Sequence, residues 1–126
     1  MTKIINTKKA PAPIGPYNQS VRTGNLLFVS GQVPFIAETM ELVVESVEAE
    51  THQVMKNIQA ILSKAGMDFK NIVKASIFCK DLNDFARINE VYGSYFSGDY
   101  PARECVEVSR LPKDVSVEIS VIAEFQ

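Results

Sequence analysis

Residues 46–66, SVEAETHQVMKNIQAILSKAG, decide the fold class because they form the clearest periodic segment of the chain. Ser46 is suited to cap a helix N-terminus, Glu48 and Glu50 suit a first turn, and Gly66 suits the end of the helix. Small and apolar side chains recur at steps of three and four, which predicts an amphipathic helix over residues 47–65: Val47, Thr51, Val54, Ile58, Ile61, Leu62 and Ala65.

Strand-like segments lie on both sides of this helix. Residues 25–30, NLLFVS, form an apolar run between turn residues, so we expect a strand that is buried on both faces. Residues 72–80, 102–108 and 115–125 also have strand character, the last with strict alternation. A second helical stripe precedes 102–108 and is stopped by Gly98, Asp99 and Pro101; it consists of Phe85, Ile88, Tyr92, Tyr95 and Phe96. The order strands, helix, strand, helix, strands predicts an α+β protein with a mixed sheet.

Length and composition restrict the class of protein further. The 126 residues fit one domain over 1–126, and 46% hydrophobic with 22% charged residues excludes intrinsic disorder and fibrous chains. Lys and Arg total 13 against 15 Asp and Glu, a net charge of −2, so the basic footprint of a nucleic-acid-binding protein is missing. Neither a signal peptide nor a membrane-spanning segment is visible, so we expect a cytoplasmic chain without membrane association.

Two helices of this length cover only one face of such a sheet. Residues 26–29 and 119–123, however, offer apolar side chains to both faces. A large exposed apolar face is unusual on a monomer. We therefore expect self-association into a homo-oligomer.

Most of the familiar catalytic and metal-binding patterns are missing. His52 is the only histidine, and we interpret it as a solvated helix residue. Cys79 and Cys105 are expected to be reduced thiols, with Cys79 packed in the core as a small hydrophobe. This set does not provide zinc-site spacing, and a Ser/His/Asp triad could be built only around His52.

The strand over 102–108 carries the first candidate site residue. A period of two places Arg103 and Cys105 on one face of that strand. The planar fork of Arg103 suits a substrate carboxylate. The alternative is a surface ion pair with a neutral cysteine alongside.

Glu118 is the second candidate, because it interrupts the apolar segment 115–123. It falls on the face of Ser116 and Ser120. If a neighbouring subunit closes that face, partial desolvation would raise the pKa of Glu118 toward values useful for a general base. The alternative is a solvated, outward-facing glutamate.

Five motifs together resemble the RidA/YjgF family: PIGPY at 13–17, SGQVP at 30–34, NIQA at 57–60, KDLNDF at 80–85 and PARECVEVSRLPKDVSVEI at 101–119. The resemblance runs almost from end to end. It implies a chorismate-mutase-like fold that assembles as a homotrimer with a cleft at each subunit boundary. It also implies hydrolysis of reactive 2-imino acids, such as 2-iminopropanoate and 2-iminobutanoate, to 2-oxo acids and ammonia, without a metal or organic cofactor.

The same resemblance implies residue roles. Arg103 would bind the substrate carboxylate, and Glu118 would deprotonate the attacking water and then help move the proton to the leaving ammonia. Cys105 would position the imine or the water and would not act as a nucleophile. The residues expected to line the cleft and bind substrate are Tyr17, Ser30, Gly31 and Asn89.

Some positions depart from the family pattern. Met40 stands where a glycine is usual in the loop 35–42, the connection 97–100 is shorter than in many members, and Glu104 stands where serine is common. An alternative function is a module that binds small carboxylates or a protein partner in the same clefts without turnover. Ribonuclease or translation-inhibitor activity, also described for the family, is disfavoured by the acidic balance of charge.

Overall fold

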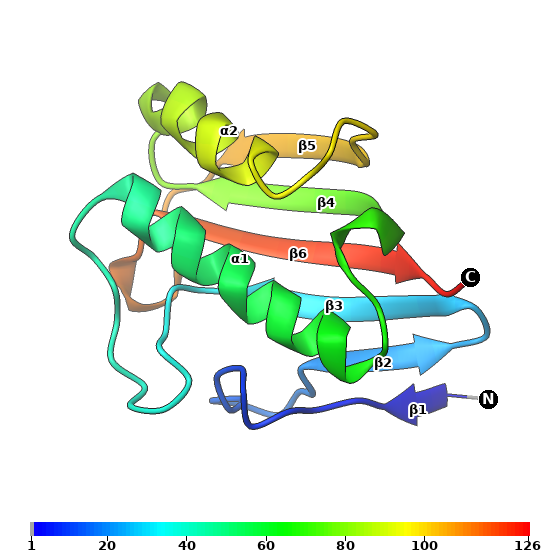
Figure 1. Ribbon diagram of the computed structural model, residues 1–126. Helices are drawn as coiled ribbons and strands as arrows, with labels where there is room; N and C mark the ends of the chain where they lie inside the picture. The colour runs from blue at the N-terminus through cyan, green and yellow to red at the C-terminus, as the bar shows by residue number, and fades with distance from the viewer. Residues whose placement is uncertain (1) are drawn as a thin grey trace.

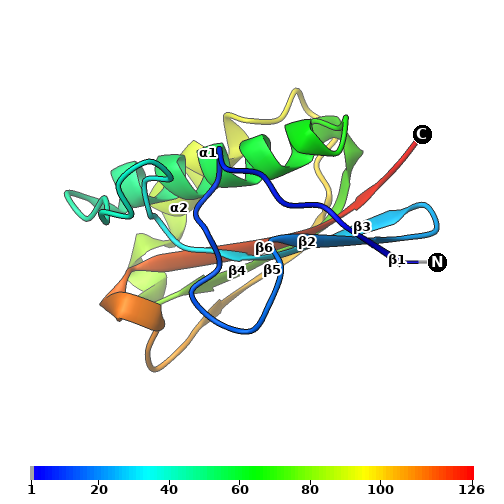
Figure 2. The same cartoon turned by 90° about the horizontal axis from the view of Figure 1, so that it is seen from below.

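Six strands form one sheet, and both α-helices pack against the same face of it in the computed structural model, which describes residues 2–126 (Figures 1 and 2). The strands are β1 Thr2–Ile4, β2 Ser20–Thr23, β3 Leu26–Gln32, β4 Ile72–Cys79, β5 Ala102–Glu107 and β6 Val117–Glu124. The helices are α1 Val47–Lys64 and α2 Phe85–Gly93.

The strand order in the sheet is β1-β2-β3-β6-β4-β5. β4 and β5 are parallel, with α2 in the connection between them, and all other neighbouring strands are antiparallel. The parallel pair requires a crossover, which α2 supplies. The α+β class, the mixed sheet and the position of both helices on one face are therefore confirmed.

Helix α1 begins and ends as its sequence predicts. The Ser46 hydroxyl accepts a hydrogen bond from the Ala49 amide at 3.0 Å, and Gly66 follows the helix with a φ of +76°. A left-handed residue just beyond a helix is a common stop signal, and glycine adopts it without strain. Five side chains of the predicted stripe are fully buried against the sheet: Thr51, Val54, Ile58, Ile61 and Leu62.

The second helix is shorter than the aromatic stripe suggests. α2 ends at Gly93, and Tyr95 and Phe96 lie in the turns that follow it. Both rings still pack against the buried core, so they were correctly expected to be apolar packing residues. The stripe suggests one longer helix because Tyr95 and Phe96 continue the helical spacing of apolar residues after α2 has ended. Phe85 also differs from expectation, since it is 40% exposed.

The N-terminal hairpin was not predicted from the sequence. β1 and β2 are short, and β1 is exposed along its whole length, so neither has a clear apolar alternation. The β2–β3 turn places Gly24 at a φ of +57°. Pairing of β1 with β2 and of β2 with β3, rather than local propensity, determines these two strands.

One face of the sheet is covered by the helices and the other is not. On β3, Leu27 and Val29 are buried beneath the helices, while Phe28 on the opposite face is 43% exposed. Burial of this strand on both faces is therefore wrong for the single chain. Val73 and Val106 are likewise exposed large apolar residues of the sheet. In the described residues, no helix is long and apolar enough to cross a membrane.

Candidate functional site

Glu118 lies in a hollow of about 350 Å³ on the side of the sheet opposite the helices. Alternation along β6 buries Val117 and Ile119 beneath the helices and turns Glu118 to the other side, together with Ser120. This is the face that the sequence predicts for it. The walls combine polar groups with apolar ones, among them Ile14, Phe35 and Pro112.

An irregularity in β3 makes room for the Glu118 carboxylate. The register between β3 and β6 shifts between Val29 and Gln32, so Ser30 and Gly31 bulge from the ladder. A Cβ added at Gly31 would lie 2.9 Å from Glu118 Cδ, a distance that real Cβ atoms do not reach. The glycine is therefore required by the close approach of the carboxylate and not by its backbone dihedrals.

Partial burial changes the acidity of Glu118. The side chain is half-buried, and desolvation raises its pKa above the ordinary value of 4.5. Desolvation acts this way because it penalises the charged form of a carboxylic acid. A carboxylate with a raised pKa is a stronger base, which is the property that general-base catalysis uses.

Tyr17 and Ser30 also line the Glu118 hollow, as expected. The Ser30 hydroxyl donates to the Asn18 carbonyl at 2.6 Å, which ties β3 to the loop that carries Tyr17. Gln19, fully buried behind this loop, binds the carbonyl groups of Thr7, Ala10 and Pro11. The loop is therefore ordered, as its prolines suggest.

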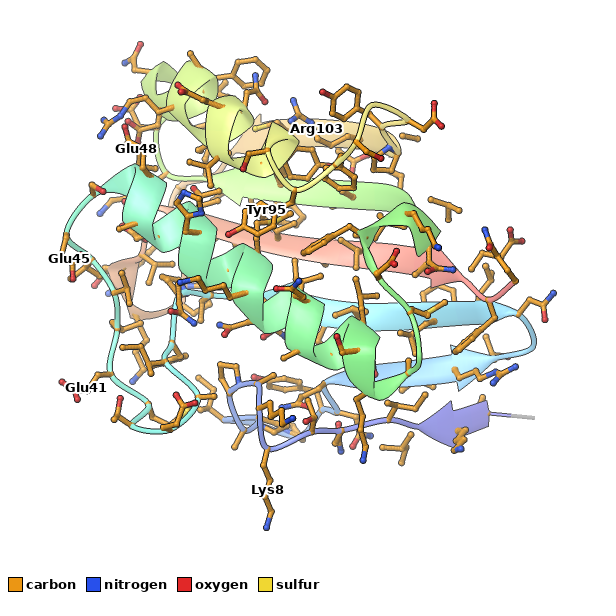
Figure 3. The ribbon with its side chains drawn as sticks, viewed as in Figure 1. Lys8, Glu41, Glu45, Glu48, Tyr95 and Arg103 are labelled. Carbon is orange, nitrogen blue, oxygen red and sulfur yellow. The ribbon has the colours of Figure 1, made fainter. Side chains whose placement is uncertain are left out.

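Arg103 lies on the helix side of the sheet, beside α2 (Figure 3). Its Nη1 donates to Asn89 Oδ1 at 2.6 Å, and its guanidinium carbon lies 5.2 Å from the ring centre of Tyr92 and 5.5 Å from that of Phe85. A second hollow, of about 300 Å³, is lined by Asn89, Tyr92, Gly93, Tyr100, Pro101 and Arg103. Arg103 and Asn89 therefore line the same hollow.

Cys105 shares the helix side of β5 with Arg103, but it is packed against the core. Its nearest titratable neighbour is Cys79, which is fully buried and donates to the Val106 carbonyl. Burial, followed by the nearby Cys105 thiol, raises the pKa of Cys79 to about 11. Both cysteines are free thiols, as predicted.

Within one chain, the predicted site residues fall into two groups on opposite sides of the sheet. Glu118, Tyr17, Ser30 and Gly31 line the first hollow, whereas Arg103 and Asn89 line the second. β4 separates the strands that carry Arg103 and Glu118. The Glu118 hollow does not include Arg103, and the Arg103 hollow does not include Glu118.

Sequence reasoning missed two aromatic residues that lie beside Arg103. Phe85 and Tyr92 were assigned only to a packing stripe, although both rings face the guanidinium. Their spacing with Asn89, at steps of four and three, places all three on one face of α2. That spacing, read together with a lone arginine on the next strand, is the signal that could have found them.

The departures from the family pattern have structural explanations. Met40 has a φ of +59°, a left-handed conformation that glycine adopts without strain. Glu104 lies on the uncovered face of the sheet, where it accepts a hydrogen bond from Ser76 and pairs with Lys74 at 3.1 Å. Ser76 and then Lys74 hold the pKa of Glu104 below its usual value. Neither change touches the two hollows.

The remaining titratable residues do not form a metal site in the part of the chain that the structure describes. His52 is exposed on α1, as predicted, and its Nδ1 lies 2.8 Å from the Tyr95 hydroxyl.

Comparison with known proteins gives consistent matches over nearly the whole chain. The family model Endoribonuclease L-PSP matches residues 7–125. A RutC family protein of Pyrococcus abyssi is 51% identical over 121 residues, covering 96% of this chain and 95% of that protein. The crystal structure of RidA from the Antarctic bacterium Psychrobacter is 45% identical, with a TM-score of 0.94, covering 98% of this chain and 99% of that one. E. coli TdcF, solved with bound serine, gives the same identity, coverage and TM-score.

Proposed function

This chain belongs to the RidA/YjgF family, and on that premise we propose that it hydrolyses 2-imino acids to 2-oxo acids and ammonia. One water adds to the C=N carbon, the C–N bond then breaks, and the water oxygen remains as the new carbonyl oxygen. A protonated imine is already electrophilic at carbon. Positioning and one proton carrier therefore suffice for catalysis.

The observation that carries this proposal is the half-buried Glu118 carboxylate, with its raised pKa, in a hollow that also contains Ser30 and Tyr17. Glu118 takes a proton from the attacking water as oxygen bonds to the imine carbon. It then returns that proton to the nitrogen; as the C–N bond breaks and ammonia leaves, Glu118 takes the remaining hydroxyl proton and passes it to water, which leaves the carbonyl of the 2-oxo acid. Substrates with small apolar side chains, such as 2-iminopropanoate and 2-iminobutanoate, match the partly apolar walls.

Arg103 binds the substrate carboxylate in this proposal. Its guanidinium is oriented by α2 and has donors left over for a bidentate contact. The E. coli TdcF structure, solved with bound serine, supports a family site that accepts a small molecule with a carboxylate. Cys105, two residues after Arg103 on β5, would help to position the imine or the water and does not attack the substrate.

The two hollows combine only if a second chain contributes. Arg103 and Glu118 lie on opposite sides of one sheet, and the uncovered face carries exposed Phe28 and Val106. We propose that this face, on which the register places both of these side chains, is covered in a homotrimer, and that each cleft unites Arg103 of one chain with Glu118 of its neighbour. Burial of exposed apolar side chains supplies the driving force for such an assembly.

The activity is tested by producing 2-aminoacrylate with a serine dehydratase and following pyruvate and ammonia. We expect the protein to accelerate their release from the imine, and Glu118→Gln to abolish most of that acceleration. An unchanged rate in the presence of the native protein would contradict the proposed reaction.

The shared cleft is tested by co-expressing two inactive variants, Arg103→Ala and Glu118→Gln, with different affinity tags. If each site takes one residue from each of two chains and the chains mix at random, one half times one half, or about a quarter, of the sites regain both native residues. We expect about that fraction of native activity in the whole mixed population, and about a third in trimers that carry both tags, because such a trimer has one native site out of three. Activity no higher than that of either variant alone would place both residues in the same chain.

A second function, binding of small carboxylates without turnover, is favoured by one observation: the Arg103 hollow exists independently of Glu118. The two functions differ in their dependence on Glu118. A pure binder would lose nothing when Glu118 becomes glutamine, whereas the hydrolase would bind a carboxylate normally and fail to turn it over.

A further inference from the structure

Arg103 is held by groups that carry no charge. Of the residues described, none places a carboxylate oxygen within 4.0 Å of its guanidinium nitrogens. Its polar partner is the amide oxygen of Asn89, and its guanidinium carbon lies over the rings of Tyr92 and Phe85. Such a set fixes the orientation of the cation without neutralising it.

Two other arginines in the chain are held in the opposite way. Arg87, two residues before Asn89, contacts Glu48 at 2.6 Å and Asp84 at 3.4 Å, and Arg110 contacts Asp114 at 2.8 Å. These pairs are exposed and neutralise their arginines locally. The contrast is that Arg87 and Arg110 contact carboxylates, whereas the α2 residue that contacts Arg103 carries an amide.

We propose that Asn89 is a positioning residue that holds Arg103 while leaving its full positive charge for an anionic ligand. The rings of Phe85 and Tyr92 help to hold the guanidinium in the same place. The three residues lie on one face of α2, so the helix presents them as a unit. An aspartate in place of Asn89 would have nearly the same shape and would still accept the hydrogen bond, but it would compete with the ligand for the guanidinium.

This inference rests on the proposed role of Arg103 and is tested by binding rather than by turnover. The probe is 2-oxobutanoate, the product of one proposed substrate, measured by isothermal titration calorimetry with the native oligomer. Its uncharged amide serves as the matched ligand. We expect Asn89→Asp to weaken binding of the carboxylate about tenfold or more, and to leave binding of the amide nearly unchanged.

Asn25→Asp is the control, because it adds the same negative charge at an exposed position in the β2–β3 turn. It should bind 2-oxobutanoate like the native protein. Asn89→Ala removes the hydrogen bond without adding a charge, so it should weaken carboxylate binding by less than Asn89→Asp does. In the activity assay, Asn89→Asp should raise KM far more than it lowers kcat.

Equal losses in Asn89→Asp and Asn89→Ala would overturn the role of charge, as would equal losses for the carboxylate and for its amide. If Asn89→Asp does not fold, Asn89→Ala provides the test. This variant must reduce the ratio of carboxylate affinity to amide affinity several-fold, or the proposal fails. A failure of the hydrolase proposal alone gives a different result. The native protein would then bind 2-oxobutanoate, Asn89→Asp would weaken that binding, and no imine hydrolysis would be detected.

Discussion

Gly31 and Glu118 lie so close together that position 31 has no space for a side chain. An added Cβ would come within 2.9 Å of Glu118 Cδ and 3.2 Å of its Cγ, and it would overlap the carboxylate oxygen Oε2. The bulge in β3 and the absence of a side chain at Gly31 together define where this carboxylate can lie.

Gly31→Ala should therefore displace Glu118 rather than simply destabilise the fold. We expect kcat for imine hydrolysis to fall about a hundredfold, because a displaced base cannot align the water, while 2-oxobutanoate still binds at Arg103. Overpacking should lower the free energy of unfolding by about 1–3 kcal/mol. Stopped-flow kinetics and urea unfolding measure the two effects.

Gly93→Ala provides the stability comparison for that variant. An added Cβ at Gly93 meets no atom within 4 Å among the described residues, and this position ends α2. We expect it to stabilise the protein by about 0.5–1 kcal/mol, because alanine is the better helix former. A Gly31→Ala variant with normal kcat would show that Glu118 tolerates displacement.

The raised pKa of Glu118 predicts a specific pH dependence of stability. The folded state favours the protonated acid, so the contribution of this group is full below its ordinary pKa of 4.5 and is lost as pH rises through the raised value. Glu118→Gln should consequently raise the Tm at pH 7 and have little effect near pH 4. Thermal unfolding followed by circular dichroism across this range provides the measurement, and a Tm at pH 7 below that of the native protein would contradict the desolvation argument.

Tyr92 predicts a stability gain from a conservative change. Its side chain is 4% exposed, and its hydroxyl has no hydrogen-bond partner among the residues described. Burial raises its pKa to about 12, so the phenol is neutral at ordinary pH. Tyr92→Phe keeps the ring beside Arg103 and removes an unsatisfied polar group, which should raise the free energy of unfolding by about 1 kcal/mol. A clear loss in calorimetric Tm would indicate that the hydroxyl is satisfied in the assembled protein.

The backbone conformation of Met40 predicts a second stabilising substitution, at a residue that lines neither hollow. Its φ of +59° costs a side-chain-bearing residue about 1 kcal/mol relative to glycine. Met40→Gly should therefore raise the free energy of unfolding by up to about that amount, less the entropy that glycine gains in the unfolded chain. Glu38→Gly, in the same loop at a residue without positive φ, should destabilise the protein and serves as the control.

The secondary structure of the central part of the chain could be predicted because its signals are local. The Ser46 cap, the helical stripe through Leu62 and the glycine at position 66 all act within one or two turns of the helix. β1 and β2 could not be predicted in this way, since β1 is ordered by its pairing with β2 and β2 by its pairing with β3. The end of α2 was missed for a similar reason: Tyr95 and Phe96 continue the spacing although the backbone does not.

For the site, the sequence by itself determined which face of each strand carries Arg103 and Glu118, because side chains on a strand alternate with a period of two. It also determined the family, through motifs spread from residue 13 to residue 119. Only the tertiary structure decided that these two residues lie on opposite sides of one sheet. Alternation describes the faces of each strand alone, whereas the register with β4 relates the faces of β5 to those of β6. The close approach of Glu118 to Gly31 and the contacts of Arg103 with uncharged residues of α2 likewise depend on packing between segments distant in sequence. No local sequence pattern records such packing.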